Sequence, residues 1–393
     1  MKKVLFCHIV LLIFTALSGC TGRSFNAERE IMYCKEKVRL VLDQGLDEGF
    51  FPRNINMGET NWNGSRMSTW TVGFWPGILW HLYEYDGDEY WLRKATHFTN
   101  QLEPARNFRT HDLGNMVYLS FGHGFRVTGD PDYRQILLKA ADNMASLYNH
   151  ETGTLLAWPW MDEFHEWPNH IIITTMANLN LLFWAARNGR PEYYQMAVNH
   201  SDASLKYLIR EDFTTWQVVH FDPVSHKPVR RLTFHGLNDE STWARGQAFA
   251  IQGLNLVYKE TGEQRFLQAS TGLAKALIER LPDDHIPYWD FDVERQEDMI
   301  KDASAAAIAA SSLIELSQMI KDRQERSYFL RAGENILKSL SGKTYKSNKT
   351  NQAFLLNSVG IRPADSEVGV STIYADYYYL EALLRYQKAD KLF

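Results

Sequence analysis

Two short segments bring together side chains that could do chemistry. Thr110-His111-Asp112-Leu113-Gly114 places an imidazole beside a carboxylate, and Glu240-Ser241-Thr242-Trp243-Ala244-Arg245-Gly246 combines a carboxylate, an indole and a guanidinium. Each segment directly precedes a stretch that is apolar enough to be a buried helix. A folding helix gains little from such groups at its start, whereas a carbohydrate site uses charged groups together with aromatic faces. The two segments therefore predict a sugar site that is built at helix starts.

Candidates for proton transfer stand before helices as well. Asn169-His170 precedes another apolar stretch, and His235 lies a few residues before Glu240. Imidazole is the one side chain whose unperturbed pKa lies near neutrality, so it can give or take a proton there. We therefore predict that Asp112, His170 and His235 are catalytic. The competing interpretation is that Asp112 only caps the helix that follows it.

A weak internal repeat indicates how these segments are positioned. Turns that contain Gly, Asp or Arg lead into helices that open with an aromatic residue, at irregular intervals that are long enough for a helical hairpin and a loop. Apolar stretches with few charged residues lie between these helices, as expected of helices that are buried on several sides. The aromatics are Tyr90, Tyr133, Tyr193, Phe266 and Tyr328, and the apolar stretches are 116–125, 171–186, 246–258 and 303–316.

Alternation of exposed and buried helices predicts an all-α fold, a toroid of helical hairpins known as an (α/α) barrel. Strands are expected only as one minor β-hairpin at 217–221 and 227–232. An α-solenoid is the competing architecture, and the irregular intervals and long polar loops count against it. Because no low-complexity linker divides the chain, we expect residues 20–393 to form a single catalytic domain.

The first 19 residues are expected to be a lipoprotein signal peptide. Lys2 and Lys3 precede an apolar run, and Leu17-Ser18-Gly19-Cys20 matches the cleavage site of such signals. Cys20 would then carry a lipid, which would be the only contact with a membrane. This predicts a periplasmic or outer-membrane-attached lipoprotein of a Gram-negative-type cell. Cys34 is left alone in the mature chain and is expected in the core.

The bulk composition is that of an ordinary globular protein with many aromatic residues, which make up 13% of the chain. A net charge of -5 argues against a nucleic-acid partner, which requires a basic face. It leaves an acidic sugar open, because local Arg and His side chains matter more than the total. With a single cysteine remaining after Cys20, no cysteine-based metal site is expected.

Seven segments, spread in order over nearly the whole mature chain, carry a resemblance to a known family. They are Thr71-Val72-Gly73-Phe74-Trp75-Pro76-Gly77, His111-Asp112-Leu113-Gly114, Met176-Ala177-Asn178-Leu179 and the ranges 239–248, 288–292, 302–310 and 375–382. Together they resemble glycoside hydrolase family 88, the unsaturated glucuronyl hydrolases. The resemblance implies an (α/α)6 barrel with no metal and no cofactor. It also implies removal of a 4,5-unsaturated uronic acid from the non-reducing end of oligosaccharides.

The chemistry that the resemblance implies is hydration of a double bond. A carboxylic acid protonates C4, water adds at C5, and the hemiketal that forms collapses to release the sugar. A second carboxylate nearby raises the pKa of the acid. That second carboxylate corresponds to Asp112. The acid itself corresponds to Thr174, aligned through the segment at Met176, and a threonine hydroxyl is no proton donor near neutral pH.

Further departures from the family surround this position. The family sequence His-Val-Val reads Gln217-Val218-Val219, and Thr-His-Gln-Gly reads Thr233-Phe234-His235-Gly236. Glu163 and His165 are additional titratable candidates. Because Asp112 is retained, these changes predict altered chemistry on an intact scaffold, with His170 or His235 as the replacement acid.

The remaining candidates are expected to bind the sugar. Indole faces can stack on its C–H faces, although most aromatics in any chain fill the core. Arg245 can hold a uronate carboxylate by a two-pronged hydrogen bond or can pair with Glu240 or Asp239 structurally, and both readings stay open. Tyr374 is weighed as a proton donor and as a packing residue. The predicted substrate-binding residues are His111, Trp70, Trp160, Thr174, Gln217, Glu240, Trp243 and Arg245.

Three functions follow as hypotheses, all with a uronic-acid-containing oligosaccharide as the partner. The first is hydrolysis of an unsaturated glucuronyl end. The second is a polysaccharide lyase on the same scaffold, in which His or Tyr removes the C5 proton, so that no unsaturated substrate and no acid at Thr174 are needed. The third is a catalytically silent sugar-binding lipoprotein.

Overall fold

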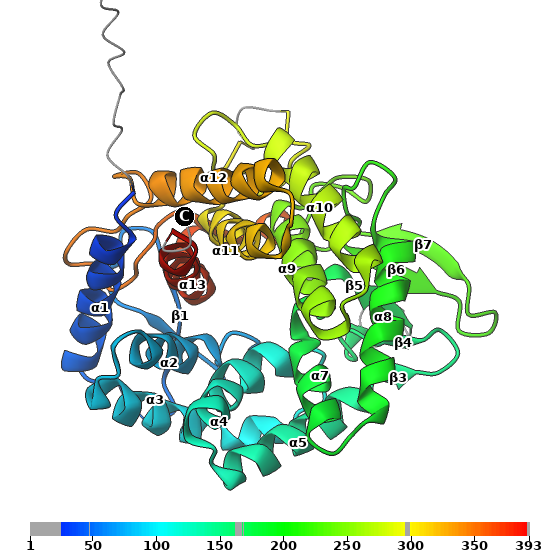
Figure 1. The fold of residues 1–393 in the computed structure, drawn as a ribbon, viewed down its shortest axis with the longest axis horizontal. Helices are drawn as coiled ribbons and strands as arrows, with labels where there is room; N and C mark the ends of the chain where they lie inside the picture. The colour runs from blue at the N-terminus through cyan, green and yellow to red at the C-terminus, as the bar shows by residue number, and fades with distance from the viewer. Residues whose placement is uncertain (1–24, 47, 162–166, 168, 295–298, 391–393) are drawn as a thin grey trace, which may run out of the picture.

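The helices form two concentric rings in the computed structural model, which describes residues 25–46, 48–161, 167, 169–294 and 299–390 (Figure 1). The outer ring consists of α1 (Ala27–Asp43), α3 (Glu89–Gln101), α5 (Pro131–Ala145), α8 (Glu192–Leu208), α10 (Gln264–Glu279) and α12 (Arg323–Leu340). The inner ring consists of α2 (Phe74–Asp86), η2 (Gly114–Gly122) with α4 (His123–Thr128), η3 (Ile173–Asn178) with α7 (Asn180–Arg187), α9 (Ala244–Thr261), α11 (Ala303–Met319) and α13 (Ile373–Asp390). The predicted (α/α)6 barrel is confirmed.

The predicted outer helices begin where the repeat places them. Asp88 caps α3 by accepting a hydrogen bond from the Tyr90 amide, and Asp322 caps α12 in the same way. Pro131 opens α5 behind the cap Asp130, where its missing N–H costs nothing. Aspartate at a helix start satisfies free N–H groups, which is why these turns recur in the sequence.

Short turns join each inner helix to the next outer helix at one end of the barrel. Gly87, Gly129 and Gly262 end α2, α4 and α9 in the left-handed conformation that glycine adopts without strain. The connections that return from outer to inner helices are long, such as residues 209–243 between α8 and α9. The long segments therefore collect at the opposite end, where the inner helices begin.

Within the described ranges, strands occur only in these long connections. The predicted hairpin is confirmed as β6 (Val218–Phe221) and β7 (Pro228–Leu232). The sequence did not predict the others: β5 (His170–Ile172) adds to this hairpin, β3 (Tyr148–Asn149) pairs with β4 (Thr154–Leu155), and a four-stranded sheet has the order β2-β1-β9-β8. Its members are β1 (Phe51–Ile55), β2 (Asn63–Ser65), β8 (Ser358–Ile361) and β9 (Ser366–Thr372).

The ring closes where β1 pairs with β9, so that Asn54 lies opposite Thr372. This pairing joins the start of the described chain to its end, and α13 packs against both α1 and α2. Cys34 is buried in the core, as predicted. No helix within the described ranges has the length and apolar character needed to cross a bilayer.

The expectation that 171–186 forms one buried helix is wrong for its first half. Residues 170–172 form β5, with Ile171 opposite Val219, and a short 3₁₀ helix follows before α7 begins. Every residue of the run Ile171 to Thr175 is β-branched. Such residues lose side-chain freedom in a helix and fit well on a pleated surface, so a neighbouring strand overrides the apolar pattern.

Candidate active site

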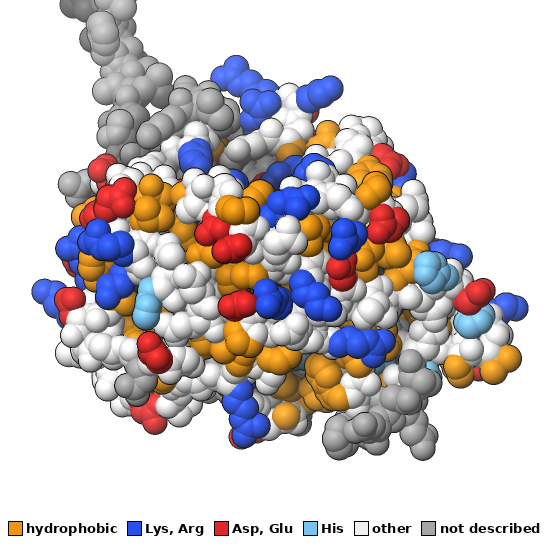
Figure 2. Space-filling view, turned by 90° about the horizontal axis from the view of Figure 1, so that it is seen from below, with side chains coloured by type: hydrophobic (Ala, Val, Ile, Leu, Met, Phe, Trp, Pro, Cys, Tyr) orange, Lys and Arg blue, Asp and Glu red, His pale blue; other side chains and the backbone are white. Residues whose placement is uncertain are grey.

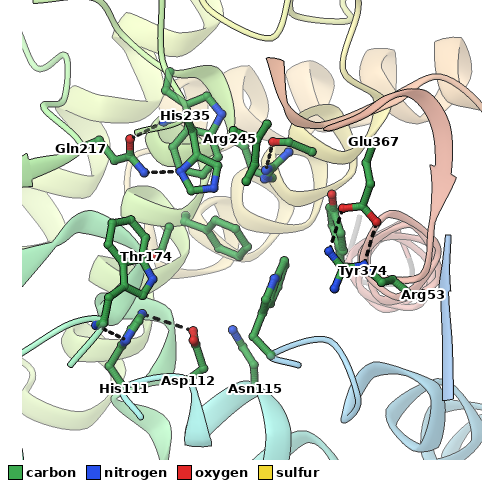
Figure 3. A pocket seen from close by; sticks show the side chains of 16 residues that line it. Arg53, His111, Asp112, Asn115, Thr174, Gln217, His235, Arg245, Glu367 and Tyr374 are labelled. Atoms are coloured by element: carbon green, nitrogen blue, oxygen red, sulfur yellow. Dashed lines mark hydrogen bonds and ion pairs between the residues drawn. The ribbon is translucent and has the colours of Figure 1, made fainter. Parts of the chain in front are cut away.

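One pocket opens at the end of the barrel where the inner helices begin (Figure 3). About 630 Å³ of empty space, part of it open to solvent, lies between its walls. Its walls come from segments that lie far apart in the chain, from β1 to α13, because the long connections converge at this end. It is lined by Arg53, Trp70, His111, Asp112, Asn115, Trp158, Thr174, Gln217, His235, Trp243, Arg245, Phe249, Gly360, Ile361, Glu367 and Tyr374.

Asp112 stands in this pocket just before η2, and its two neighbours in sequence orient it. His111 Nε2 lies 3.3 Å from Asp112 Oδ1, and the Thr110 hydroxyl lies 3.3 Å from Oδ2. The Trp158 amide donates to His111 Nδ1 at 3.4 Å, so the ring carries its proton on Nε2, the nitrogen that lies beside Asp112. Burial lowers the pKa of His111, although Asp112 opposes this. A neutral imidazole therefore holds the carboxylate in place.

Thr174 lies in the first turn of η3 and faces the same pocket. The start of η2 packs tightly against the end of η3, where the Asn115 amide donates to Asn178 Oδ1 at 2.7 Å. Gly114 makes this approach possible, since a Cβ there would lie 2.4 Å from the Asn178 carbonyl oxygen. The glycine of the His-Asp-Leu-Gly motif thus brings Asp112 and Thr174 into one pocket.

Gln217 and His235 form a hydrogen-bonded pair on the pocket wall (Figure 3). Gln217 extends from the start of β6, and the His235 ring stacks on Trp243 with centroids 4.5 Å apart. Burial, together with the Arg245 charge, lowers the pKa of His235 to about 3. His235 is therefore neutral near pH 7.

Aromatic side chains form much of the remaining wall. Trp70 packs against Tyr374 at 4.9 Å, and Trp158 lies 6.0 Å from His235. Trp158 has a φ of 39°, although it precedes Pro159, a position that favours extended backbone. A side chain held in so unfavourable a conformation is typical of functional sites, where the surrounding structure enforces it.

Arg245 is 3% exposed, and its hydrogen bonds are used within the protein. Its guanidinium pairs with Asp302 at 3.2 Å and donates to the carbonyl oxygens of Val359 and Gly360. Its faces pack on Trp243 and Tyr374. The structural partner is Asp302 and not Glu240 or Asp239, which were the partners considered from sequence.

A second charged pair lines the other side of the pocket (Figure 3). Arg53 from β1 binds both carboxylate oxygens of Glu367 from β9, at 2.8 and 3.1 Å. Glu367 has a φ of 54°, a left-handed conformation that is uncommon for a residue with a side chain. Tyr374 lies next to this pair, and burial raises its pKa to about 12, so its hydroxyl stays protonated.

Three predicted site residues do not line the pocket. His170 is buried behind Trp158, with its Nδ1 bonded to the Trp167 carbonyl oxygen, and burial lowers its pKa to about 4. Trp160 is 47% exposed. Glu240 is exposed and accepts a hydrogen bond from Trp216 at the edge of a separate, shallower pocket. Glu163, His165 and Cys20 lie outside the described residues.

The other predicted residues do meet in the pocket: Asp112, His111, His235, Trp70, Thr174, Gln217, Trp243 and Arg245. Sequence reasoning missed Arg53, Asn115, Trp158, Phe249, Gly360, Ile361 and Glu367. The segment Trp158-Pro159-Trp160 was recognisable as aromatic, but only the backbone shows which indole faces inward. No local signal marks Arg53 and Glu367, because strand pairing between distant segments brings them together.

One group of potential metal ligands occurs among the described residues, outside the pocket. His81 and Glu84 on α2 and His123 on α4 have ligand atoms within 4.8 Å of one another. Arg126 already pairs with Glu84 at 2.7 Å and contacts His123 Nδ1 at 3.3 Å. Because a guanidinium occupies the position of a cation, we interpret this group as an ion-pair network.

Buried neutral histidines make the stability of the fold sensitive to acid. The pKa is lowered by burial to about 4 for His170 and to about 3 for His200 and His235. Below pH ~6.5 the unfolded chain binds these protons and the folded chain does not. The free energy of unfolding therefore has its full value above pH ~6.5 and decreases as the pH falls toward the pKa values of the folded chain. Asp376 acts in the opposite direction, because burial raises its pKa. Between pH 7.5 and 5.5 we expect a net loss on the order of 3 kcal/mol, measured by urea unfolding. An unchanged midpoint would contradict this.

Comparisons with known proteins agree with the fold. No family model matches the chain. The unsaturated glucuronyl hydrolase of Formosa agariphila is 35% identical over 371 residues, covering 92% of this chain and 91% of that protein. The crystal structure of an unsaturated glucuronyl hydrolase specific for heparin superposes with a TM-score of 0.87 and 34% identity, over 93% of this chain and 98% of the other. The unsaturated chondroitin disaccharide hydrolase of Streptococcus pyogenes is 34% identical, over 81% of both chains. The chain belongs to the unsaturated glucuronyl hydrolases, glycoside hydrolase family 88.

Proposed function

We propose that this protein releases a 4,5-unsaturated uronic acid from the non-reducing end of oligosaccharides, with Asp112 as the reacting carboxylate. The observation that carries the proposal is the oriented His111–Asp112 pair in an aromatic-walled pocket of the family fold. The relatives are named for unsaturated glucuronyl and chondroitin disaccharide substrates, which supports the same class of substrate here.

Asp112 is the better placed of the two carboxylates that line the pocket. Both oxygens of Glu367 are bound by Arg53, so that side chain is committed to an ion pair. Among the described residues, His111 contacts one oxygen of Asp112 and Thr110 contacts the other. Each oxygen therefore keeps a lone pair that can accept a hydrogen bond from a ligand. Neutral His235 and the hydroxyl of Thr174 can donate hydrogen bonds to a sugar, but neither is an acid near neutral pH.

The reaction then runs on one carboxyl group. The fraction of Asp112 that carries a proton gives it to C4, and the double-bond electrons form the new C–H bond while the ring oxygen stabilises the cation at C5. The oxygen of a water molecule adds to C5, and Asp112 takes the proton that this water releases. The C5 hemiketal opens, and the neighbouring sugar leaves. One water is consumed, and Asp112 returns to its starting state.

An absorbance assay separates this proposal from its alternatives. Purified protein is incubated with unsaturated disaccharides of the chondroitin and heparin types and, separately, with the intact polymers. Loss of the ultraviolet absorbance of the C4–C5 double bond supports the hydrolase. A gain on the intact polymers identifies a lyase, and binding without any change identifies a silent sugar-binding protein.

We also propose that Cys20 is lipidated and anchors the protein to a periplasmic membrane face. The support is the sequence Leu17-Ser18-Gly19-Cys20 after a charged start and an apolar run. Cys20→Ser should move the protein from the membrane fraction to the soluble fraction. Retention of this variant in the membrane fraction would contradict the proposal.

A further inference from the structure

The side-chain amide of Gln217 has a single possible orientation. Its Oε1 accepts three hydrogen bonds, from the Thr233 hydroxyl at 2.8 Å, the Phe234 amide at 2.7 Å and the His235 amide at 2.8 Å. A carbonyl oxygen can accept these bonds and an NH₂ group cannot. The Nε2 group of Gln217 therefore faces away from the three donors, toward the His235 ring.

This orientation fixes the tautomer of His235. Gln217 Nε2 lies 2.5 Å from His235 Nδ1, and an amide NH₂ can only donate. Nδ1 must accept, so the ring proton is on Nε2. Stacking on Trp243 holds the plane of the ring, and among the described residues no protein group pairs with Nε2. That N–H is left for whatever occupies the pocket.

We infer that Gln217 is a positioning residue that keeps His235 a neutral imidazole whose Nε2–H donates to an oxygen of the bound uronic acid. The inference rests on the proposed function for its substrate. His235 would thereby be a binding group for the ligand, and the proton that reaches C4 would come from Asp112.

The charges around His235 are consistent with a neutral ring. Arg245 on α9 is the charged group that acts on it, and burial with this charge lowers the pKa of His235 to about 3. Asp290 is occupied by the Leu237 amide and the Ser241 hydroxyl. The other carboxylates of the pocket are Asp112, bound by His111, and Glu367, bound by Arg53. None of these forms a hydrogen bond with the ring within the described ranges.

The residue types at positions 217 and 235 also differ from those in the family motifs. Gln217 stands where the family motif His-Val-Val has histidine, and His235 stands where Thr-His-Gln-Gly has glutamine. In this chain the two side chains share a hydrogen bond, so a substitution at either position changes what the other presents to the ligand. If the pair acts as a unit, the effects of substitutions at positions 217 and 235 on activity should not be additive.

Gln217→Glu tests the tautomer, because the shape is kept and only the donor is lost. A carboxylate still accepts from Thr233, Phe234 and His235, but it requires a proton on His235 Nδ1. The pKa of the ring then rises, and once the ring is neutral its Nε2 becomes an acceptor. We expect kcat/KM of the variant to fall about tenfold more than that of the wild type as pH rises through this new pKa. An equal loss at every pH, or no loss, would overturn the inference.

Two further measurements keep this test apart from the assay of function. Nitrogen NMR of His235 in the free protein should show a protonated Nε2 at every pH above ~4 in the wild type, whether or not any substrate turns over. A proton on Nδ1 would overturn the inference while leaving the proposed function untouched. The exchange variant Gln217→His with His235→Gln should recover at least half of the activity that His235→Gln loses, and failure to recover any would also overturn it.

Discussion

Asp112→Asn is expected to lower kcat/KM on unsaturated disaccharides by about a thousandfold or more, within the range of lost general acid–base catalysis. An amide can neither give a proton to C4 nor take one from water. The fold should be unaffected, because Asn Oδ1 still accepts from His111 Nε2 and the Thr110 hydroxyl can accept from the new NH₂ group. Steady-state kinetics and a thermal melt of the same preparation measure both quantities.

The matched control is Asp132→Asn, which makes the same change on the exposed first turn of α5. It should leave kcat/KM within about twofold of the wild type, since surface substitutions away from a site rarely matter. Retention of more than a tenth of the activity by Asp112→Asn would show that another group is the acid. A variant that fails to fold would show that the residue is structural.

The fold was largely predictable because the residues at which many helices begin and end can be recognised in the local sequence. Gly87, Gly129 and Gly262 end three of the inner helices, and an aspartate caps the outer helices α3, α5 and α12, so these caps are visible in the sequence without knowledge of contacts. The strands were less visible. β1 and β9 are far apart in the chain, and only closure of the ring brings Asn54 opposite Thr372. The sequence predicts a helix at residues 171–175, because a short apolar run that is buried on both sides has the same pattern in a strand as in a helix.

The candidate site likewise contains residues that local sequence places and residues that only long-range pairing places. Asp112 and Trp243 precede inner helices and Thr174 lies in the first turn of one, so the topology that the repeat predicts also places them at one mouth of the barrel. Arg53 and Glu367 belong to strands whose pairing is long-range, and they were missed. The sequence analysis named Trp160 and not Trp158, because the inward turn depends on a backbone conformation at φ 39° that sequence does not reveal. The role of His170 as an acid stays a prediction, although the residue lies behind the pocket wall.

The state of His235 shows why residue type alone was insufficient. From the sequence, a histidine before a helix is a candidate acid, since its usual pKa lies near neutrality. In the structure, burial lowers that pKa to about 3 and Gln217 occupies Nδ1. The same residue then becomes a hydrogen-bond donor, and the proton must come from a carboxyl group.

Thr174→Asp is expected to raise kcat/KM on unsaturated disaccharides by roughly tenfold to a hundredfold, the range for adding a general acid. The position suits a carboxylate, because Thr174 lies in the first turn of η3, where free N–H groups and the helix dipole favour negative charge. A second carboxylate in the pocket of Asp112 also raises the pKa of one member of the pair, so that an acid is available near neutral pH. The gain should therefore shrink as pH rises above the higher pKa of the pair.

Thr174→Asn separates this effect from a change of shape, because the amide is the same size as the carboxylate but cannot transfer a proton. It should show no gain at any pH, while both variants should melt within a few degrees of the wild type. If Thr174→Asp is no faster than Thr174→Asn, the pocket no longer uses an acid at this position. Activity on an intact polymer in the same experiment would then favour elimination over hydration as the chemistry of this chain.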